Sequence, residues 1–372
     1  MPAASHQIRV TQLPKSALKI CVTCVGGILI YDFIKALRDA DDYDVHVFGA
    51  DSDPEAHGRL LCDSFDIVPR ADRDPAGWLE RMTGLIKTNA IDGVICLSDK
   101  EAKIAADNHP IWRDLGVETS VGPKRTAEVM TDKLHLLSAL AEHGLDTGGF
   151  LPVHSTGEVR KAVEQLGYPG TRVVVKPRRE SGSRGVLVCD ASRGSFTHFL
   201  HNRLCGAGRL EQVIEIAREG GMTFEDCIAV PYWDGPVFDV ECLVQGGKVV
   251  QTVARRRQLR NIYSPTSTGH IVDMQPSVVN YAHRMCEILG VERAADFDIV
   301  LRPDGKPAPF DASPRFSGSV GGGYYAGVNI ISQLVRVMFG MPLASFTVRN
   351  GVPLRPFRTL TAIPEANADM LL

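Results

Sequence analysis

The stretch DFDIVLRPDGKPAPFDASPR, residues 296–315, decides how this chain is interpreted. Residues 297–301 alternate as in a strand, Pro-Asp-Gly at 303–305 favours a turn, and residues 309–312 are again extended. The pattern predicts a β-hairpin in which acidic side chains from both strands can share one face.

The acids in question are Asp298 and Asp311, one on each strand of the expected hairpin. Mg²⁺ prefers carboxylate oxygens at about 2.0–2.1 Å and leaves its other positions to water and phosphates. Ser313 and Arg315 follow on the same side of the second strand, and offer a hydroxyl ligand and a cation for a developing negative charge. We expect a Mg²⁺ or Mn²⁺ site here, although an ordinary surface hairpin with solvated acids fits this segment alone equally well.

The amino-acid composition limits the classes of protein to which the chain can belong. The 372 residues are 44% hydrophobic and 23% charged, as in globular proteins of two or three domains. The net charge of −3 does not provide the excess of positive charge that is typical of proteins that bind nucleic acid or an anionic membrane. No apolar window has the length of a membrane span, and residues 1–19 lack a signal-peptide core. We therefore expect a cytoplasmic protein without nucleic-acid or membrane partners.

The first part of the chain alternates between strands and helices. The apolar run at 18–25 is typical of a strand buried on both faces of a parallel sheet. A glycine pair and a helical period follow it, and the pattern predicts a doubly wound α/β domain to about residue 127. The further elements expected in it are a helix at 30–40 and strands at 45–49 and 91–97.

The pair Gly26-Gly27 allows a dinucleotide site, with Asp51 on a ribose, and therefore a nicotinamide oxidoreductase. The fingerprint is incomplete, because Ile28 and Tyr31 stand where glycines are required. We favour a structural turn.

Nine cysteines are scattered along the chain. Cys21 and Cys24 form a C-x-x-C, but the pair falls in the expected buried strand and no second metal-binding pair follows. Core packing is the preferred interpretation over a redox or zinc site.

The second part of the chain predicts an α+β unit. Lys176 ends a β-branched strand and precedes the loop PRRESGSRG at 177–185. Glycines let backbone N–H groups approach phosphate oxygens, and the cations neutralise charge. A polyphosphate site and a solvated basic turn both fit. The elements expected here are helices at 126–143, 153–167 and 280–289, strands at 172–176 and 186–190, and a hairpin within 228–250.

In their order and spacing, these segments resemble the ATP-grasp superfamily, and in particular the synthetase halves of the large subunit of carbamoyl phosphate synthase, over roughly residues 18–345. The resemblance implies an N-terminal parallel-sheet domain (1–127) followed by a two-lobed ATP-grasp domain (128–345, lid lobe about 150–230) and a C-terminal tail (346–372).

The resemblance also implies the ATP site. Lys133 in the sequence Thr-Asp-Lys and Lys176 would hold the phosphates, and D-A-S-P-R at 311–315 resembles the E-x-N-x-R motif of the family. Asp311 and Ser313 replace the usual Glu and Asn, but both still offer oxygen ligands. The other implied ATP contacts are Ser181, Gly182, Ser183 and Gly185 in the lid, Val230 and Tyr232 beside the adenine, and Asp239 on the ribose.

The function implied is an ATP-dependent carboxylate–amine ligase that works through an acyl phosphate on a small amino-acid or peptide-like metabolite, in specialised biosynthesis, as a homodimer. Arg315 and the N–H groups of residues 318–323 would stabilise the oxyanion. The alternative is a nucleotide-binding protein with weak or no catalysis and a regulatory role, suggested by the two motif departures.

Two further segments are candidates for substrate contacts. Arg255 and Arg257 should share one face of a strand, with Arg256 on the other face. The guanidinium groups of Arg255 and Arg257 would clamp a substrate carboxylate. A solvated charge run is the alternative. The glycine-rich run at 319–329 is interpreted as a substrate-binding loop in preference to a helix-docking turn.

Overall fold

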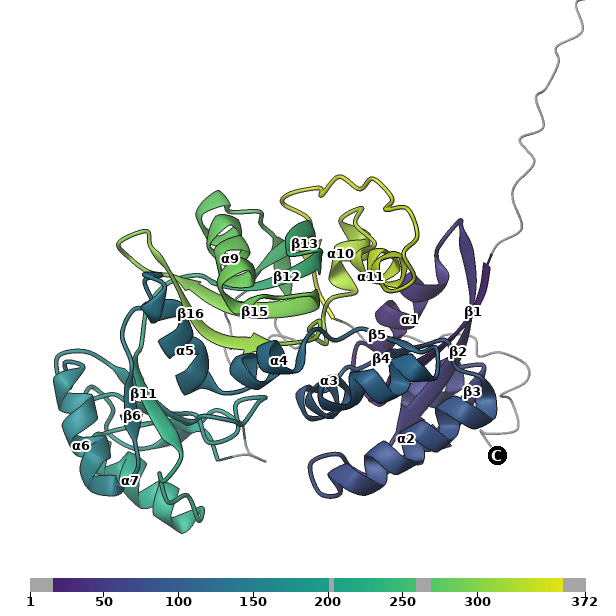
Figure 1. Ribbon diagram of the computed structural model, residues 1–372. Coiled ribbons are helices and arrows are strands. Elements are labelled where there is room, and N and C mark those ends of the chain that lie inside the picture. The colour runs from purple at the N-terminus through teal and green to yellow at the C-terminus, as the bar shows by residue number, and fades with distance from the viewer. Residues whose placement is uncertain (1–15, 201–203, 259–268, 357–372) are drawn as a thin grey trace, which may run out of the picture.

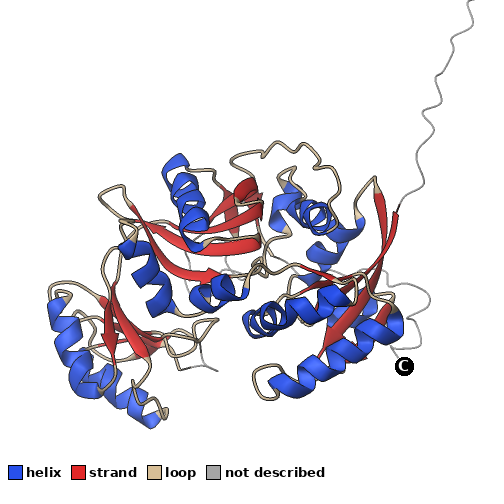
Figure 2. Cartoon of the chain, viewed as in Figure 1, coloured by secondary structure: helices blue, strands red, loops and turns tan. Residues whose placement is uncertain are grey.

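A computed structural model describes residues 16–200, 204–258 and 269–356. The described chain forms three sheets, one parallel and two predominantly antiparallel, with helices packed on them (Figures 1 and 2). The predicted order, a parallel α/β unit followed by a two-part α+β unit, is confirmed.

The first sheet is parallel, with the strand order β3-β2-β1-β4-β5. Leu18, Ile20 and Val22 pack against α1, whereas Cys21 faces the opposite core formed by α2 and α3. The strand is therefore apolar on both faces, which explains its uninterrupted hydrophobic sequence. The elements are β1 Ser16–Thr23, α1 Ile30–Arg38, β2 Tyr43–Asp51, the 3₁₀ helix η1 His57–Leu61, β3 Ser64–Ile67, α2 Pro75–Asn89, β4 Gly93–Ile95, α3 Asp99–Asp114 and β5 Glu118–Thr119.

The glycine pair after β1 is built as a structural turn. Gly27 donates its N–H to the carbonyl of Cys24 at 3.2 Å, and Gly26 donates to Asp51 Oδ2 at 2.8 Å. The carboxylate considered as a ribose ligand thus closes the turn. Cys24 lies beyond the end of β1 at φ 54°, with its Sγ donating to Glu101 Oε2 at 3.3 Å, so the expectation of a strand residue was wrong for this cysteine.

The single helix expected at 126–143 is divided into α4 (Lys124–Met130) and α5 (Lys133–Glu142). Asp132 separates them, because its side chain accepts the N–H groups of Leu134 and His135 as an N-cap. The break places Lys133 at the first turn of a helix.

The second sheet has the order β6-β11-β7-β8-β10-β9 and forms the lobe at the lower left of Figure 1. Its buried side chains, Val173 and Val175 among them, pack with those of α6 and α7. The elements are β6 Leu151–Val153, α6 Thr156–Gln165, β7 Val173–Pro177, β8 Leu187–Cys189, β9 Thr197–His198, β10 Gly206–Gly208, α7 Leu210–Glu219 and β11 Cys227–Pro231.

The third sheet is antiparallel, with the order β16-β15-β12-β13-β14-β17. Phe238, Val240 and Cys242 of β12 pack with α9 in one core, which leaves Asp239 and Glu241 on the opposite face. The elements are β12 Val237–Gln245, β13 Lys248–Arg257, β14 His270–Val272, α9 Pro276–Leu289, β15 Arg293–Leu301, β16 Pro307–Ser313 and β17 Pro353–Leu354. The last strand belongs to the segment expected as a tail, and residues 357–372 of that tail lie outside the described residues.

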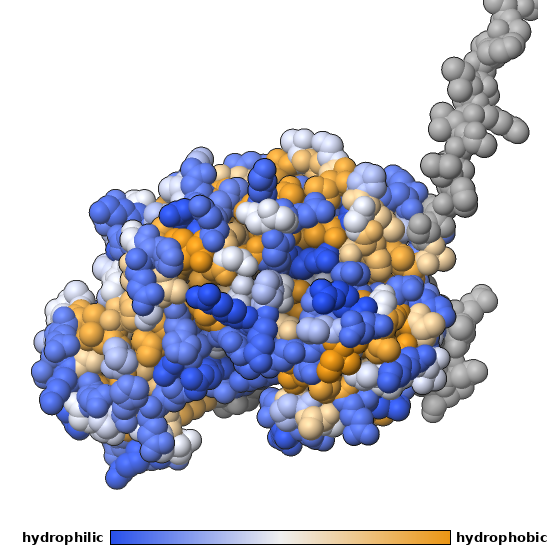
Figure 3. Space-filling model, viewed as in Figure 1, coloured by the Kyte–Doolittle hydropathy of each residue, from blue (hydrophilic) through white to orange (hydrophobic). Residues whose placement is uncertain are grey.

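Helix α11 (Ile330–Met338) joins the first and third sheets. All nine of its residues are buried, and the apolar ones share one core with Ile20 of β1, Ile34 of α1 and Leu243 of β12. The short helix α10 (Gly322–Tyr325) precedes it. Among the described residues no helix is long and apolar enough to span a membrane. In Figure 3, hydrophilic residues dominate the surface between the lower-left lobe and the right-hand domain.

Candidate active site

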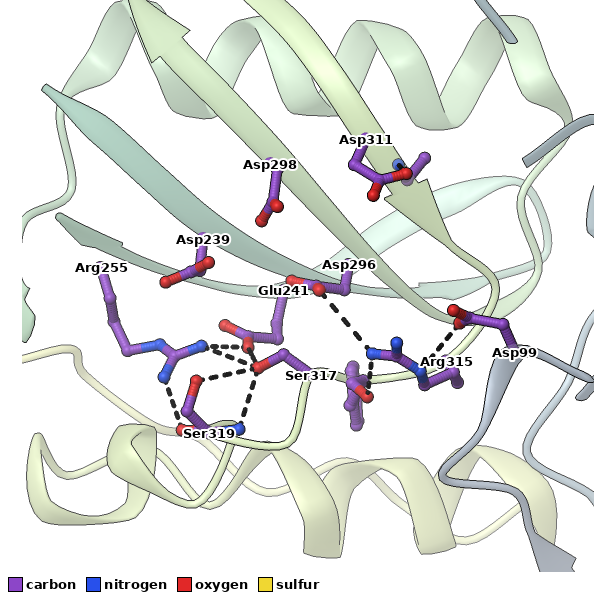
Figure 4. A network of polar contacts seen from close by, with 12 residues as sticks. Asp99, Asp239, Glu241, Arg255, Asp296, Asp298, Asp311, Arg315, Ser317 and Ser319 are labelled. Atoms are coloured by element: carbon purple, nitrogen blue, oxygen red, sulfur yellow. Dashed lines mark hydrogen bonds and ion pairs between the residues drawn. The ribbon is translucent and has the colours of Figure 1, made fainter. Parts of the chain in front are cut away.

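The hairpin of β15 and β16 places its two acids directly opposite each other. Asp298 pairs with Asp311 in the strand register, Asp239 of β12 pairs with Asp298, and Arg255 of β13 pairs with Asp239. Four charged residues thus form one row across four neighbouring strands. The next row pairs Glu241 with Asp296 and Asp296 with Ser313, so one face of the sheet is lined with acids (Figure 4).

The two lysines expected to bind phosphate lie beside this row. Lys133 Nζ is 3.2 Å from Asp311 Oδ1 and donates to the carbonyl of Glu180 at 2.7 Å. Lys176 Nζ donates to the carbonyl of Phe310 at 2.6 Å. The pKa of Lys176 is lowered to about 8, first by burial and then by the charge of Lys133, against the opposing charge of Asp311. Side chains from α5, β7 and β16 therefore meet at one place.

The acidic side chains are electrostatically coupled. The pKa of Asp298 is raised to about 7 by burial and by its acidic neighbours Asp239 and Asp311, against the opposing charge of Arg257. The pKa of Asp296 is raised well above its ordinary value by burial and then by the charge of Glu241. Such a cluster of carboxylates favours the binding of a cation.

The two arginines expected to clamp a substrate carboxylate are instead buried in ion pairs. Arg255 has no exposed surface; it pairs with the buried Glu241 and donates to the carbonyl of Ser319. Arg257 pairs with Asp239, and its Nη2 lies 2.6 Å from Asp298 Oδ1. A direct substrate contact is excluded for Arg255 in this arrangement, because its guanidinium is covered on all sides.

The predicted alternation along β13 is confirmed. Arg255 and Arg257 both meet acids of one face of the sheet, whereas Arg256 pairs with Asp273 at 2.9 Å. The alternative of a solvated charge run is wrong for the two buried arginines.

Arg315 stands between two domains. Its Nε lies 2.9 Å from Asp99 Oδ1 at the start of α3, and its Nη1 lies 3.9 Å from Asp296 Oδ2 (Figure 4). The guanidinium therefore lies between the carboxylate of Asp99, from the domain of the first sheet, and that of Asp296, from the third sheet.

The glycine-rich segment after Arg315 does not present the row of N–H groups expected of an oxyanion site. The N–H of Ser319 donates to Ser317 Oγ, and those of Val320, Gly322 and Gly323 donate to carbonyls within the loop. The loop instead packs on α1: Tyr324 and Tyr325 donate their hydroxyls to Asp39 and Asp32, each at 2.6 Å. The docking interpretation, which was the less favoured one, describes these contacts.

The lid segment borders a cavity of about 380 Å³ that is also lined by Lys133, Asp311 and Asp99. Ser181 lines this cavity directly. Gly182, Ser183 and Gly185 all have positive φ angles, and a Cβ on Gly185 would lie 2.6 Å from Pro177 Cγ. Glycine at 185 is therefore required for the close return of the chain to β7.

The segment expected to lie beside the adenine connects the second and third sheets. Val230 is in β11 and packs in a small core with Leu137. Tyr232 follows β11, stacks 4.0 Å from the guanidinium of Arg172, and donates its N–H to the carbonyl of that residue. The N–H of Tyr232 is thus already used within the protein. Asp239, the expected ribose ligand, lies in a different sheet, where it pairs with Arg257 and with His270 Nε2 at 2.7 Å.

The oxygen donors present fit a hard divalent cation whose remaining coordination positions are filled by substrate oxygens. Among the described residues no three His, Cys, Asp or Glu side chains converge as a metal site. Asp298 and Asp311 form a directly opposed pair whose side chains are 20% and 31% exposed, and Ser313 lies in the next row. Two carboxylates with water and phosphate oxygens are the usual surroundings of Mg²⁺ in phosphoryl-transfer sites.

Sequence reasoning missed several charged residues of this region. Glu241 and Asp296 each lie two positions from a predicted site residue on the same strand, so the two-residue period could have identified them. Asp99, Asp132 and His270 gave no local signal, because their partners are distant in sequence.

Comparisons with known proteins agree with this architecture. Residues 223–358 match the family described as "ATP-grasp in the biosynthetic pathway with Ter operon". No curated protein sequence shows a significant match to the chain.

Several solved structures share the fold over most of the chain. An L-amino acid ligase from Bacillus licheniformis is 19% identical with a TM-score of 0.63, covering 87% of this chain and 75% of that one. N5-carboxyaminoimidazole synthetase from Staphylococcus aureus in complex with ADP is 14% identical with a TM-score of 0.65, covering 91% and 81%. A biotin carboxylase–ATP complex from Campylobacter jejuni is 12% identical with a TM-score of 0.63, covering 89% and 73%. The chain therefore has the ATP-grasp fold, and its residues 223–358 match an ATP-grasp family model.

Proposed function

We propose that the protein is an ATP-dependent ligase that joins a small carboxylate to an amine through an acyl phosphate and releases ADP and phosphate. One observation carries the proposal: Lys133 and Asp311 line a cavity of about 380 Å³, Asp298 lies opposite Asp311 in the strand register, and Lys176 Nζ donates to the carbonyl of the adjacent Phe310. Phosphoryl transfer requires such positioning and charge neutralisation more than covalent catalysis by the protein. The likeness in fold to an L-amino acid ligase supports the same reaction class.

We assign the roles that the resemblance to the ATP-grasp superfamily implies. Lys133 and Lys176 neutralise the phosphates of ATP, while Val230 and Tyr232 border the adenine. A carboxylate oxygen of the substrate attacks the γ-phosphorus and ADP leaves; an amine nitrogen then attacks the acyl carbon and inorganic phosphate leaves. Arg315 neutralises the oxyanion of the second step.

The cation has a defined place in this proposal. Asp298 and Asp311 would hold Mg²⁺ or Mn²⁺, with Ser313 as a third oxygen donor. When bound, the ion neutralises charge on the phosphate oxygens.

A second candidate is a nucleotide-binding protein without turnover. The direct contact of Lys133 with Asp311 favours it, because an acid neutralised by lysine attracts a metal ion less strongly.

ADP release separates the two candidates. The purified protein is incubated with ATP and Mg²⁺ and with pairs drawn from the common amino acids, and ADP and the condensed product are measured together by chromatography and mass spectrometry. The ligase predicts ADP formation that depends on one amine and one carboxylate, in equal amounts with the product. Tight ATP binding without ADP for any pair would favour the second candidate.

A further inference from the structure

The shorter of the two carboxylate contacts of Arg315 comes from another domain (Figure 4). Arg315 Nε lies 2.9 Å from Asp99 Oδ1, whereas its Nη1 lies 3.9 Å from Asp296 Oδ2 on the third sheet. Asp99 is the first residue of α3 and belongs to the domain of the first sheet. That domain therefore brings a charged side chain to the proposed reaction centre.

Within the described parts of the chain, the Asp99 carboxylate contacts no charged group other than Arg315. Neither Asp99 Oδ1 nor Arg315 Nε has a hydrogen bond to any other described residue. The cap of α3 is a different residue, because Ser98 Oγ accepts the N–H of Glu101 at 3.4 Å. The Asp99 side chain is thus not used by its own helix.

The backbone at the start of α3 is held by the first domain. The N–H groups of Cys96 and Leu97, just before the helix, donate to Ser120 Oγ at 3.0 Å and to Thr23 Oγ1 at 3.3 Å. Trp112 of α3 is fully buried in the same core. Asp99 is therefore a fixed partner for an arginine side chain, which otherwise has about 2 kcal/mol of rotamer entropy.

The contact also stabilises the charge of Arg315. Burial acts to lower the pKa of this guanidinium, but the charges of Asp99 and then Asp296 outweigh burial and raise the pKa above its ordinary value. Of the acids around Arg315, Asp99 has the largest effect.

Asp99 lies in the wall of the cavity of about 380 Å³ that is also lined by Lys133 and Asp311. Its contact with Arg315 is thus made beside the space in which the proposed reaction takes place. A displacement of about 1 Å in a group that acts on the reacting atoms can lower the rate about a hundredfold.

We propose that Asp99 is a positioning residue, which holds the guanidinium of Arg315 in the orientation that neutralises the oxyanion when the amine attacks. Asp99 acts through Arg315 and not by contact with the substrate. The proposal rests on the proposed ligase function, because it assigns a residue of the first domain to the second step of that reaction.

Steady-state kinetics of Asp99→Asn, with the substrate pair that is best for wild type, test this role. The amide keeps the size of the side chain and removes its charge. We expect kcat for the condensed product to fall about tenfold, less than the hundredfold or more that follows loss of an oxyanion donor, with KM for ATP within about twofold of wild type. The ratio of ADP to product should rise above that of wild type, because an acyl phosphate that waits longer for the amine is hydrolysed.

Glu118→Gln is the matched control. Glu118 of β5 also joins the first domain to the third sheet, with its Oε2 2.8 Å from Arg293 Nη2, but it does not line the cavity. Its kcat and its ratio of ADP to product should stay within about twofold of wild type. If Asp99 only joined the two domains, the two variants would behave alike.

A double variant tests whether Asp99 acts through Arg315. Asp99→Asn added to Arg315→Gln should lower kcat by less than about twofold, since residues that act as a unit are not additive. Two independent residues would multiply their losses. Affinity of each variant for a non-hydrolysable ATP analogue, close to that of wild type, shows that the proteins are folded.

The outcomes separate the positioning role from the reaction. A wild-type kcat or ADP ratio in Asp99→Asn, an equal loss in Glu118→Gln, or multiplied losses in the double variant would overturn the role of Asp99 and leave the ligase standing. No ADP and no product from the wild type with any substrate pair would overturn the ligase, and with it the role of Asp99.

Discussion

Lys133 Nζ lies 3.2 Å from Asp311 Oδ1, although Lys133 begins α5 and Asp311 lies in β16, more than a hundred positions later. The contact fixes the start of α5 against β16. It also pairs Lys133, which is expected to bind phosphate, with Asp311, which is expected to bind the metal ion. The predictions below follow from this arrangement and from the buried charges around it.

The charge of Lys176 should make ATP binding depend on pH. Burial lowers its pKa to about 8, so the ammonium group is lost as the pH rises through that value. The affinity for an ATP analogue should fall about tenfold between pH 7 and pH 9, because a phosphate contact loses its cation. Lys176→Met should bind weakly with little pH dependence. Identical pH profiles for the two proteins would contradict the role of this lysine.

Asp298 should impose the opposite pH dependence on metal binding. Burial raises its pKa to about 7, so the carboxylate is protonated as the pH falls through that value. Mn²⁺ affinity, measured by titration with the ATP analogue present, should decrease about tenfold from pH 8 to pH 6, since a metal ligand must be deprotonated. Asp304→Asn, in the exposed turn of the same hairpin, should behave as wild type. Metal affinity that is flat over this range in wild type would argue against Asp298 as a ligand.

Asp132 has two separable structural roles. It caps α5, and it forms a two-bond ion pair with Arg178 at 2.7 and 3.0 Å. Asp132→Asn keeps the cap and should lower the free energy of unfolding by about 3 kcal/mol, the low end for a broken buried pair, because Asp226 also contacts Arg178. Asp132→Ala should cost about 1 kcal/mol more through the lost cap. Urea denaturation measures both, and equal losses would show that the cap contributes nothing.

Arg255 should act through stability and not through substrate contact. Glu241→Gln leaves a fully buried guanidinium without its carboxylate, and should destabilise the protein by about 3–5 kcal/mol. Replacing both partners, as Glu241→Leu with Arg255→Met, should recover most of that loss, since a buried ion pair contributes little net stability over apolar residues. Thermal and urea unfolding test this. A double variant as unstable as Glu241→Gln would refute the pairing.

The sequence predicted the order of sheets because the local patterns agree with the fold. The apolar run of β1, the turn residues at 303–305 and the alternation in β15 each have one compatible structure. The helix at 126–143 was predicted without its break, since the capping role of Asp132 competes with a continuous helical period.

The site was predictable only as far as its motifs extend along the chain. Lys133, Lys176, Asp298 and Asp311 were identified together, and the structure brings them together. The burial of Arg255 was not predictable, because its partner Glu241 is on another strand and its other contacts come from the loop at 317–319. Charges that neutralise each other across strands look like exposed functional groups when each is considered alone.

The most direct test of the ATP and metal centre is ADP formation by Asp311→Asn with the substrate pair that is best for wild type. Removing one of two metal carboxylates should lower the rate at least a hundredfold, while the thermal unfolding midpoint stays close to that of the Asp304→Asn control. If Asp311→Asn forms ADP at close to the wild-type rate, Asp298 and Asp311 are not the metal ligands and the proposed centre is wrong.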